Sequence, residues 1–184
     1  MSSRVSQVVL LCEDDLQARL VRAFMKLLGL NAQVREIIAS RMAYGGNVSW
    51  VLNRFPSELH ACRQRHKLVR TLLIVMIDAD DFSTEERRRA LSNKCVAAEY
   101  SPLIENDPLA ILIPKRHVET WICNLLGIAV EETQDCKSIA STKKEDIRRA
   151  AQTLEAWVTN VLPESCVPSL KQSVPELRRI QDCK

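Results

Sequence analysis

The sequence predicts an α/β protein with a Rossmann-like open, mostly parallel sheet of about four strands, helices on both faces and two extra C-terminal helices. Two observations lead to this prediction. Short apolar runs bounded by polar residues recur along the chain, as in strands buried on both faces of a parallel sheet. Segments with apolar residues at helical spacing alternate with these runs, which implies parallel pairing through right-handed crossovers.

The first strand is predicted over residues 7–12, which are mostly apolar. A helix follows over residues 16–28, because apolar residues recur in it at helical spacing. Gly29 stands where a helix of this length ends. A second strand is expected over 32–38, and a loop over 40–47, which contains a Gly-Gly pair.

The middle of the chain repeats this order. A helix is predicted over 48–64, with Pro56 expected to kink or restart it. The third strand covers 71–77. The next helix begins at Ser83, where Glu86 completes a capping box, and is expected to reach residue 100.

The fourth strand is predicted over 109–113, because Pro114 follows it, and a helix over 117–126 ends at Gly127. Residues 131–142 are polar and predicted to be irregular. Two helices complete the chain, over 143–161 and 168–180. We expect one domain over residues 1–184, with a core at about 5–127 and a C-terminal helical extension at about 143–184.

The composition is that of a globular protein with a sizeable core, since 46% of the 184 residues are hydrophobic and 27% are charged. A net charge of +3 gives no global field that would attract nucleic acid, although a local basic surface is compatible with it. The seven cysteines form no CxxC motif, so we expect reduced thiols in a cytoplasmic protein. We also expect no signal peptide and no membrane-spanning segment.

Acidic residues follow two of the predicted strands. Glu13 comes directly after the first strand, and Asp78 and Asp80 come after the third. Ligands bind parallel sheets beyond the carboxyl ends of the strands, so these side chains are expected at one rim. Asp78 and Asp80 would point the same way in an extended segment. Carboxylates crowded together repel unless a cation neutralises them, and carboxylate oxygens suit Mg²⁺ or Mn²⁺. We therefore predict a metal site of Glu13, Asp78 and Asp80.

This arrangement resembles the topoisomerase–primase (Toprim) signature, in which a glutamate and an Asp-x-Asp pair follow two strands of a Rossmann-like fold. The resemblance covers about residues 5–127. It is closest to small stand-alone bacterial members and to the nuclease domain of overcoming-lysogenization-defect proteins. The segment from Ile113 to Trp121 is also similar to what such small proteins carry after their fourth strand.

The resemblance implies Mg²⁺- or Mn²⁺-dependent hydrolysis of a nucleic-acid phosphodiester, with DNA favoured over RNA. It also implies a role in defence against foreign DNA. A separate ATPase partner and a homodimer are both compatible with that role. Three positions depart from the family pattern. Asp14 and Asp81 replace glycines, and Gln17 replaces a second acid four residues after the glutamate. Metal binding is therefore a firmer expectation than catalysis.

Further candidate residues lie near the fourth strand. Glu119 either completes the catalytic carboxylate set or serves as a favourable acid at a helix N-terminus. Lys115 and Arg116 are predicted to bind phosphate, with His117 beside them, unless the segment is a solvated basic loop. The run Arg87 to Arg89 either contacts a phosphate backbone or forms a solvated helix face.

Two other functions stay open. The chain could be a non-catalytic Toprim-fold subunit or interaction partner, which the departures at Asp14 and Gln17 favour. It could also be a receiver-type signalling domain, phosphorylated on Asp78 with Glu13 and Asp14 binding Mg²⁺. A receiver needs a fifth strand with a lysine, and no clear fifth strand follows residues 109–113.

Overall fold

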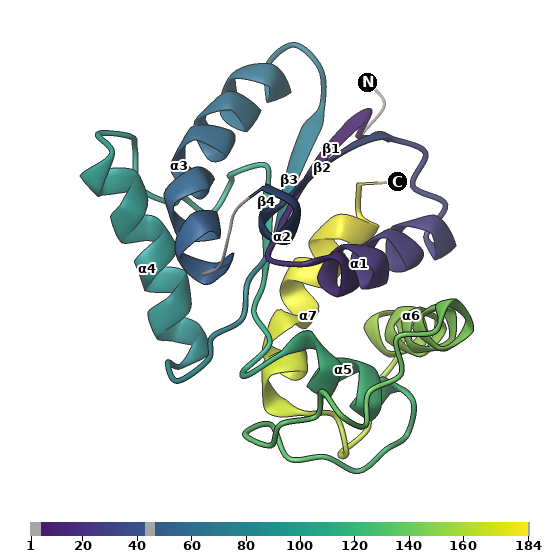
Figure 1. The fold of residues 1–184 in the computed structure, drawn as a ribbon. Helices are drawn as coiled ribbons and strands as arrows, with labels where there is room; N and C mark the ends of the chain where they lie inside the picture. The colour runs from purple at the N-terminus through teal and green to yellow at the C-terminus, as the bar shows by residue number, and fades with distance from the viewer. Residues whose placement is uncertain (1–4, 43–46, 184) are drawn as a thin grey trace.

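The computed structural model describes residues 5–42 and 47–183. A four-stranded, all-parallel sheet with strand order β2-β1-β3-β4 runs through the middle of the molecule (Figure 1). The strands are β1 (Gln7–Cys12), β2 (Gln33–Ile38), β3 (Thr71–Met76) and β4 (Leu109–Leu112). The α/β fold class and the parallel sheet predicted from the sequence are confirmed.

Helices cover both faces of the sheet. On one face lie α3 (Asn47–His66) and α4 (Thr84–Ala97), together with the short α2 (Ala39–Met42). On the other face lie α1 (Asp15–Leu27), α5 (Val118–Leu125), α6 (Lys144–Thr159) and α7 (Pro168–Gln181). Alternate residues of the strands point to opposite faces, so each face has its own hydrophobic core.

Local signals in the sequence explain where several helices begin and end. Ser83 and Glu86 form both bonds of the predicted capping box at the start of α4. Gly29 and Gly127 follow α1 and α5 with positive φ angles of 71° and 81°, a conformation that glycine adopts without strain.

Two local predictions need correction. The segment predicted as a loop over 40–47 contains α2 at Ala39–Met42, and residues 43–46, with the Gly-Gly pair, lie outside the described residues. Pro56 neither splits nor restarts the second predicted helix, because α3 is a single helix with Pro56 inside it. Buried Val51, Phe55 and Leu59 hold α3 on the sheet, and this packing outweighs the hydrogen bond that proline cannot donate.

The C-terminal helices belong to the same folded unit as the sheet. α6 packs against α1, and α7 packs against β4. Arg179 Nη1 donates to the Leu109 carbonyl at 3.0 Å, so α7 satisfies part of the free edge of β4. The two chain ends also meet, because Val5 N donates to the Cys183 carbonyl at 3.0 Å.

Candidate functional site

The carboxyl ends of β1 and β3 bring Glu13 and Asp78 together. The two strands pair in parallel with Cys12 opposite Met76, so the residues that follow leave the sheet side by side. Asp78 N donates to Glu13 Oε1 at 2.5 Å, although the residues lie 65 positions apart in sequence. Both side chains are buried. The structure thus places the glutamate and the first aspartate at the same rim.

Gln17 connects these two acids. Its side chain is fully buried; its Nε2 donates to Asp78 Oδ1 at 2.9 Å and its Oε1 accepts from Glu13 N at 3.0 Å. Asp14 caps α1 and accepts from Gln17 N at 2.9 Å, which positions the first turn of the helix. Gln17 therefore holds the rim together, a role that the sequence did not suggest.

Asp80 has different surroundings from Asp78. Its φ angle is 55°, in the left-handed region that few non-glycine residues adopt, so the backbone is no longer extended at this position. Asp80 Oδ2 lies 3.7 Å from Arg87 Nη2, and its side chain is 46% exposed. The extended segment predicted over Asp78 and Asp80 is therefore wrong, because the backbone turns at Asp80 and the two side chains have different surroundings. An ion shared by the two aspartates stays a prediction.

Cations hold the loop between β3 and α4 in this conformation. Lys115 Nζ donates to the carbonyls of Asp80 at 3.2 Å and Phe82 at 2.6 Å. Arg87 Nη2 donates to the Ala79 carbonyl at 3.0 Å. Lys115, predicted to bind phosphate, thus contacts the loop that carries the acidic residues.

The two buried acids of the rim are harder to ionise than exposed carboxylates. Burial, together with the charges of Asp80 and Asp14, raises the pKa of Glu13 from 4.5 to about 7, although the hydrogen bond from the Asp78 amide and the charge of Arg87 act to lower it. Burial, followed by the Glu13 charge, raises the pKa of Asp78. Like charges in a poorly solvated site favour protonation unless a cation neutralises them.

The donor set fits Mg²⁺ or Mn²⁺ in chemistry, because it offers carboxylate oxygens and no soft ligand. Within residues 5–42 and 47–183, however, no three His, Cys, Asp or Glu side chains are arranged to hold a metal ion. Mg²⁺ commonly takes only one or two protein carboxylates and keeps several waters. The rim is thus compatible with an ion bound partly through water, and it is not a complete protein shell.

Glu119 and Trp121 lie in α5. Glu119 is close enough to Asp78 for its charge to raise the pKa of that aspartate. It is therefore near the same rim. Trp121 is buried, and its Nε1 donates to Ser169 Oγ at 2.8 Å, so its role is packing against α7.

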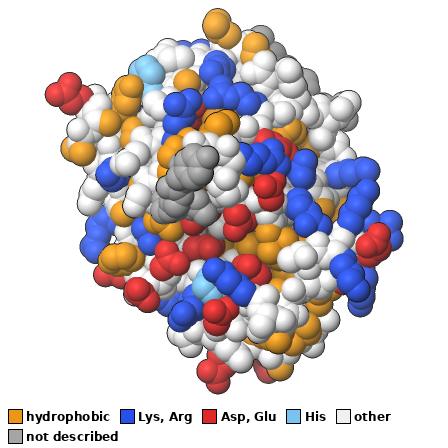
Figure 2. Space-filling view, in the orientation of Figure 1, with side chains coloured by type: hydrophobic (Ala, Val, Ile, Leu, Met, Phe, Trp, Pro, Cys, Tyr) orange, Lys and Arg blue, Asp and Glu red, His pale blue; other side chains and the backbone are white. Residues whose placement is uncertain are grey.

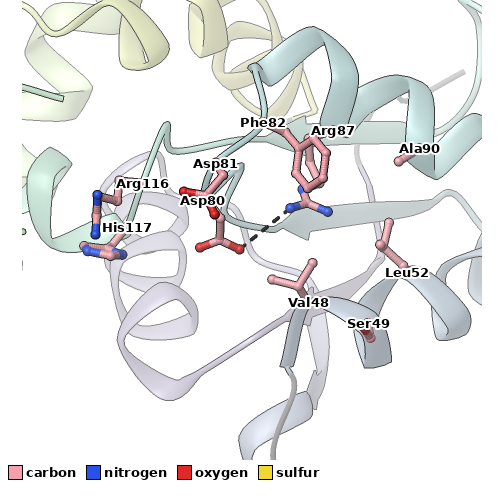
Figure 3. A pocket seen from close by; sticks show the side chains of 10 residues that line it. All are labelled: Val48, Ser49, Leu52, Asp80, Asp81, Phe82, Arg87, Ala90, Arg116 and His117. Atoms are coloured by element: carbon pink, nitrogen blue, oxygen red, sulfur yellow. Dashed lines mark ion pairs between the residues drawn. The ribbon is translucent and has the colours of Figure 1, made fainter. Parts of the chain in front are cut away.

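A pocket of about 640 Å³ opens beside Asp80. Figure 3 shows Asp80 between Arg87 on one side and Arg116 and His117 on the other, above Val48 of α3. Arg116 is exposed and donates to the Thr133 carbonyl at 3.1 Å. Arg116 thus lies beside the acidic loop, and its binding of phosphate stays a prediction.

Arg87 also lines the pocket, although the sequence left open whether it contacts a phosphate backbone or lies on a solvated helix face. Among the three consecutive arginines of α4, Arg87 is buried, whereas Arg88 and Arg89 are exposed. A signal was present, because Arg87 shares one helical stripe with Leu91 and Cys95, the other buried residues of α4.

The surface around the site has mixed charge. Figure 2 shows acidic side chains gathered near the middle of one face, with lysine and arginine side chains on several sides of them. None of the helices in the described ranges combines the length and apolar character needed to cross a membrane. All seven cysteines carry free thiols, and six of them are buried.

Comparisons with protein-family models, with curated proteins and with solved structures found no match to this chain.

Proposed function

We propose that this chain is a cytoplasmic Mg²⁺- or Mn²⁺-dependent hydrolase of nucleic-acid phosphodiesters, acting at the rim formed by β1 and β3. The observation that carries the proposal is the meeting of Glu13 and Asp78 at the ends of adjacent parallel strands, with the charges of Asp80 and Glu119 acting on Asp78. The resemblance of these positions to the Toprim signature supports the same reading.

In this proposal Asp78 and Asp80 bind the metal ion, and Glu13 either binds it through water or acts as the general base. A pKa of about 7 suits Glu13 to accept a proton near neutral pH. Glu119 completes the acidic set, and Lys115 and Arg116 hold the phosphate. A bound divalent ion would polarise the phosphodiester and lower the pKa of a coordinated water.

The test is cleavage of end-labelled DNA and RNA oligonucleotides by the purified chain in Mg²⁺, Mn²⁺ or EDTA. We expect cleavage with a divalent ion and none in EDTA. Asp78→Asn and Asp80→Asn should each lower the rate at least about a hundredfold, since a metal ion contributes several kcal/mol to such a reaction. Glu145→Gln, an exposed acid of α6, is the matched control and should leave the rate unchanged.

Calorimetry gives a second readout. The parent should bind Mn²⁺ at millimolar concentration or below, and the Asp78→Asn and Asp80→Asn variants should bind it more weakly. A parent that binds no divalent ion would exclude the catalytic proposal. Variants that bind as well as the parent would exclude the site.

A non-catalytic Toprim-fold subunit is the second candidate, and one contact favours it. The Gln17 amide donates to Asp78 Oδ1 and so occupies an oxygen that a metal ion would otherwise use. A separate ATPase or a second copy of the chain would then be the partner. Folded protein that shows neither Mn²⁺ binding nor cleavage would support this candidate. No observation favours the receiver-type signalling domain. A receiver carries its lysine on a fifth strand, and the sheet of the described residues has four strands.

A further inference from the structure

Two residues that line the pocket beside Asp80 each have a buried side-chain nitrogen with no hydrogen-bond partner among the described residues. Arg87 and His117 both line it and are only 5% and 9% exposed. Within the described part of the chain, Arg87 Nε and His117 Nε2 have no hydrogen-bond partner. Buried polar atoms are usually satisfied, so a shift of either side chain that brings its free nitrogen to an acceptor in the pocket would be favourable.

The pocket has cationic or hydrogen-bond-donating side chains on both sides of Asp80 (Figure 3). Arg87 and Arg116 supply positive charge from two sides, and His117 lies next to Arg116 (Figure 3). The acids of the pocket are Asp80 and Asp81. Asp80 already lies 3.7 Å from Arg87, and Asp81 is exposed to solvent, which screens its charge. His117 Nε2 is also 3.6 Å from the exposed Asp135 Oδ1, too far for a hydrogen bond.

We propose that this pocket binds a phosphate group of the nucleic-acid backbone through Arg87, Arg116 and His117. The inference rests on the proposed function, and it deepens that function by adding a phosphate subsite next to Asp80. Arginine is suited to this role because its planar guanidinium offers several donors to phosphate oxygens. Val48, Leu52 and Ala90 form apolar parts of the lining, so Arg87, Arg116 and His117 are its positively charged or hydrogen-bond-donating ring groups, and Ser49 is a further polar residue there.

The experiment measures binding without catalysis. A fluorescein-labelled single-stranded DNA of about 12 nucleotides, long enough to span one typical binding groove, is titrated with the full chain in EDTA and followed by anisotropy. The same sequence with a methylphosphonate backbone, which lacks the phosphate charge, serves as the second probe. Inorganic phosphate is added as a competitor, to distinguish a site for free phosphate from a site for the backbone.

We expect Arg87→Lys and Arg116→Gln each to weaken DNA binding about tenfold, the loss for one charge-assisted hydrogen bond. Lysine retains the charge at position 87 and loses the planar donors. Arg148→Gln, which removes an exposed charge from α6 on the other face of the sheet, should change binding less than about twofold, as one distant surface charge acts only weakly. The methylphosphonate probe should bind weakly to every form.

Several outcomes would overturn the inference. Binding within twofold of the parent in both pocket variants would do so, as would equal binding of the uncharged probe. Loss of binding in Arg87→Lys alone, with a lowered melting temperature, would show a structural role for Arg87 only. Competition by inorganic phosphate at concentrations as low as those of the DNA would assign the pocket to free phosphate. Cleavage in Mn²⁺ is measured separately from DNA binding in EDTA. The phosphate subsite can therefore be refuted while the hydrolase proposal is supported, and the hydrolase proposal can be refuted while the subsite is supported.

Discussion

Gln17 is the residue on which the geometry of the acidic rim most depends. It bonds to the Glu13 backbone and to the Asp78 carboxylate, and it does so from a fully buried position. A neutral amide can donate to a carboxylate, whereas an acid in its place would add a further negative charge. Glutamine rather than an acid at position 17 thus stabilises the rim without a metal ion.

Replacing Gln17 with glutamate should destabilise the protein in EDTA. The Gln17→Glu variant loses the donor to Asp78 and adds a buried charge, and we expect a loss of about 1–3 kcal/mol in the free energy of unfolding. Urea denaturation measures it. Gln152→Glu, at an exposed position of α6, is the control and should stay within about 0.5 kcal/mol of the parent. Equal stability of the two variants would contradict the role assigned to Gln17.

Glu13 should make stability fall as the pH rises. Its pKa is raised from 4.5 to about 7 by burial, so between these values the folded state holds a proton that the unfolded state has released. Its contribution is therefore fully present below pH 4.5 and is lost as the pH rises through 7. Asp78, whose pKa is also raised, acts in the same direction.

Urea titrations in EDTA should show this loss in the free energy of unfolding, which is on the order of 1–3 kcal/mol for a pKa shift of this size. Glu13→Gln keeps an oxygen for the Asp78 amide and cannot ionise, so its stability should vary less with pH. Glu145→Gln, at an exposed position, should retain the slope of the parent. The role assigned to Glu13 would be refuted if the free energy of unfolding of the parent increased between pH 5 and pH 7, because this window lies between the unfolded and folded pKa values of Glu13.

Among the elements, the loop from β3 to α4 depends on a residue that follows β4. Lys115 donates to two carbonyls of this loop, and Asp80 within it adopts the left-handed conformation. Such a conformation costs on the order of 1–3 kcal/mol unless its surroundings hold it. The contacts of Lys115 therefore stabilise the backbone that presents Asp80.

Removing this lysine should loosen the loop even without nucleic acid. We expect Lys115→Met to increase amide exchange at residues 80–83 about tenfold, since the net loss of its two partly solvated hydrogen bonds lowers the opening free energy by roughly 1.4 kcal/mol. Hydrogen–deuterium exchange mass spectrometry measures this. Lys67→Met, at an exposed lysine, is the control. Unchanged exchange would leave phosphate binding as the remaining role for Lys115.

α7 is the other element with a testable role. It covers the edge of β4, and Leu177 is 1% exposed in the core between α7 and the sheet. Leu177→Ala should cost about 2–5 kcal/mol in the free energy of unfolding, because it leaves a cavity. Lys171→Ala, exposed on the same helix, should be nearly neutral in the same urea titration. A neutral Leu177→Ala would mean that α7 contributes little to the fold.

For the whole molecule, the sheet separates two cores that should unfold together. Ile37 belongs to the core beneath α3, and Ile147 to the core beneath α1 and α6. Ile37→Val and Ile147→Val should each cost about 0.5–1.5 kcal/mol, and the costs should add within about 0.5 kcal/mol in the double variant. Urea titrations followed by circular dichroism and tryptophan fluorescence should coincide. Two separate transitions would contradict a single cooperative domain.

Much of this architecture could be predicted from residue patterns. The apolar runs gave the four strands, and the Ser83 capping box and Gly127 marked helix ends that the structure confirms. The loop predicted over 40–47 was wrong at residues 40–42, which belong to α2. A restart of the helix at Pro56 was also wrong, because packing of α3 on the sheet outweighs the local preference of proline, whereas a kink there stays a prediction.

The chain's own periodicity determined the parallel sheet and the ends of its strands, and so which acids follow those strands. Only the tertiary structure decided how these acids meet. Gln17 bonds to Asp78, Lys115 contacts the Asp80 loop, and Arg87 turns inward on the opposite side of Asp80 from His117 and Arg116 (Figure 3). The physical reason is the range of the forces involved. Strands and helix ends depend on neighbours a few residues away, whereas contacts between buried polar groups depend on residues brought together from distant parts of the chain.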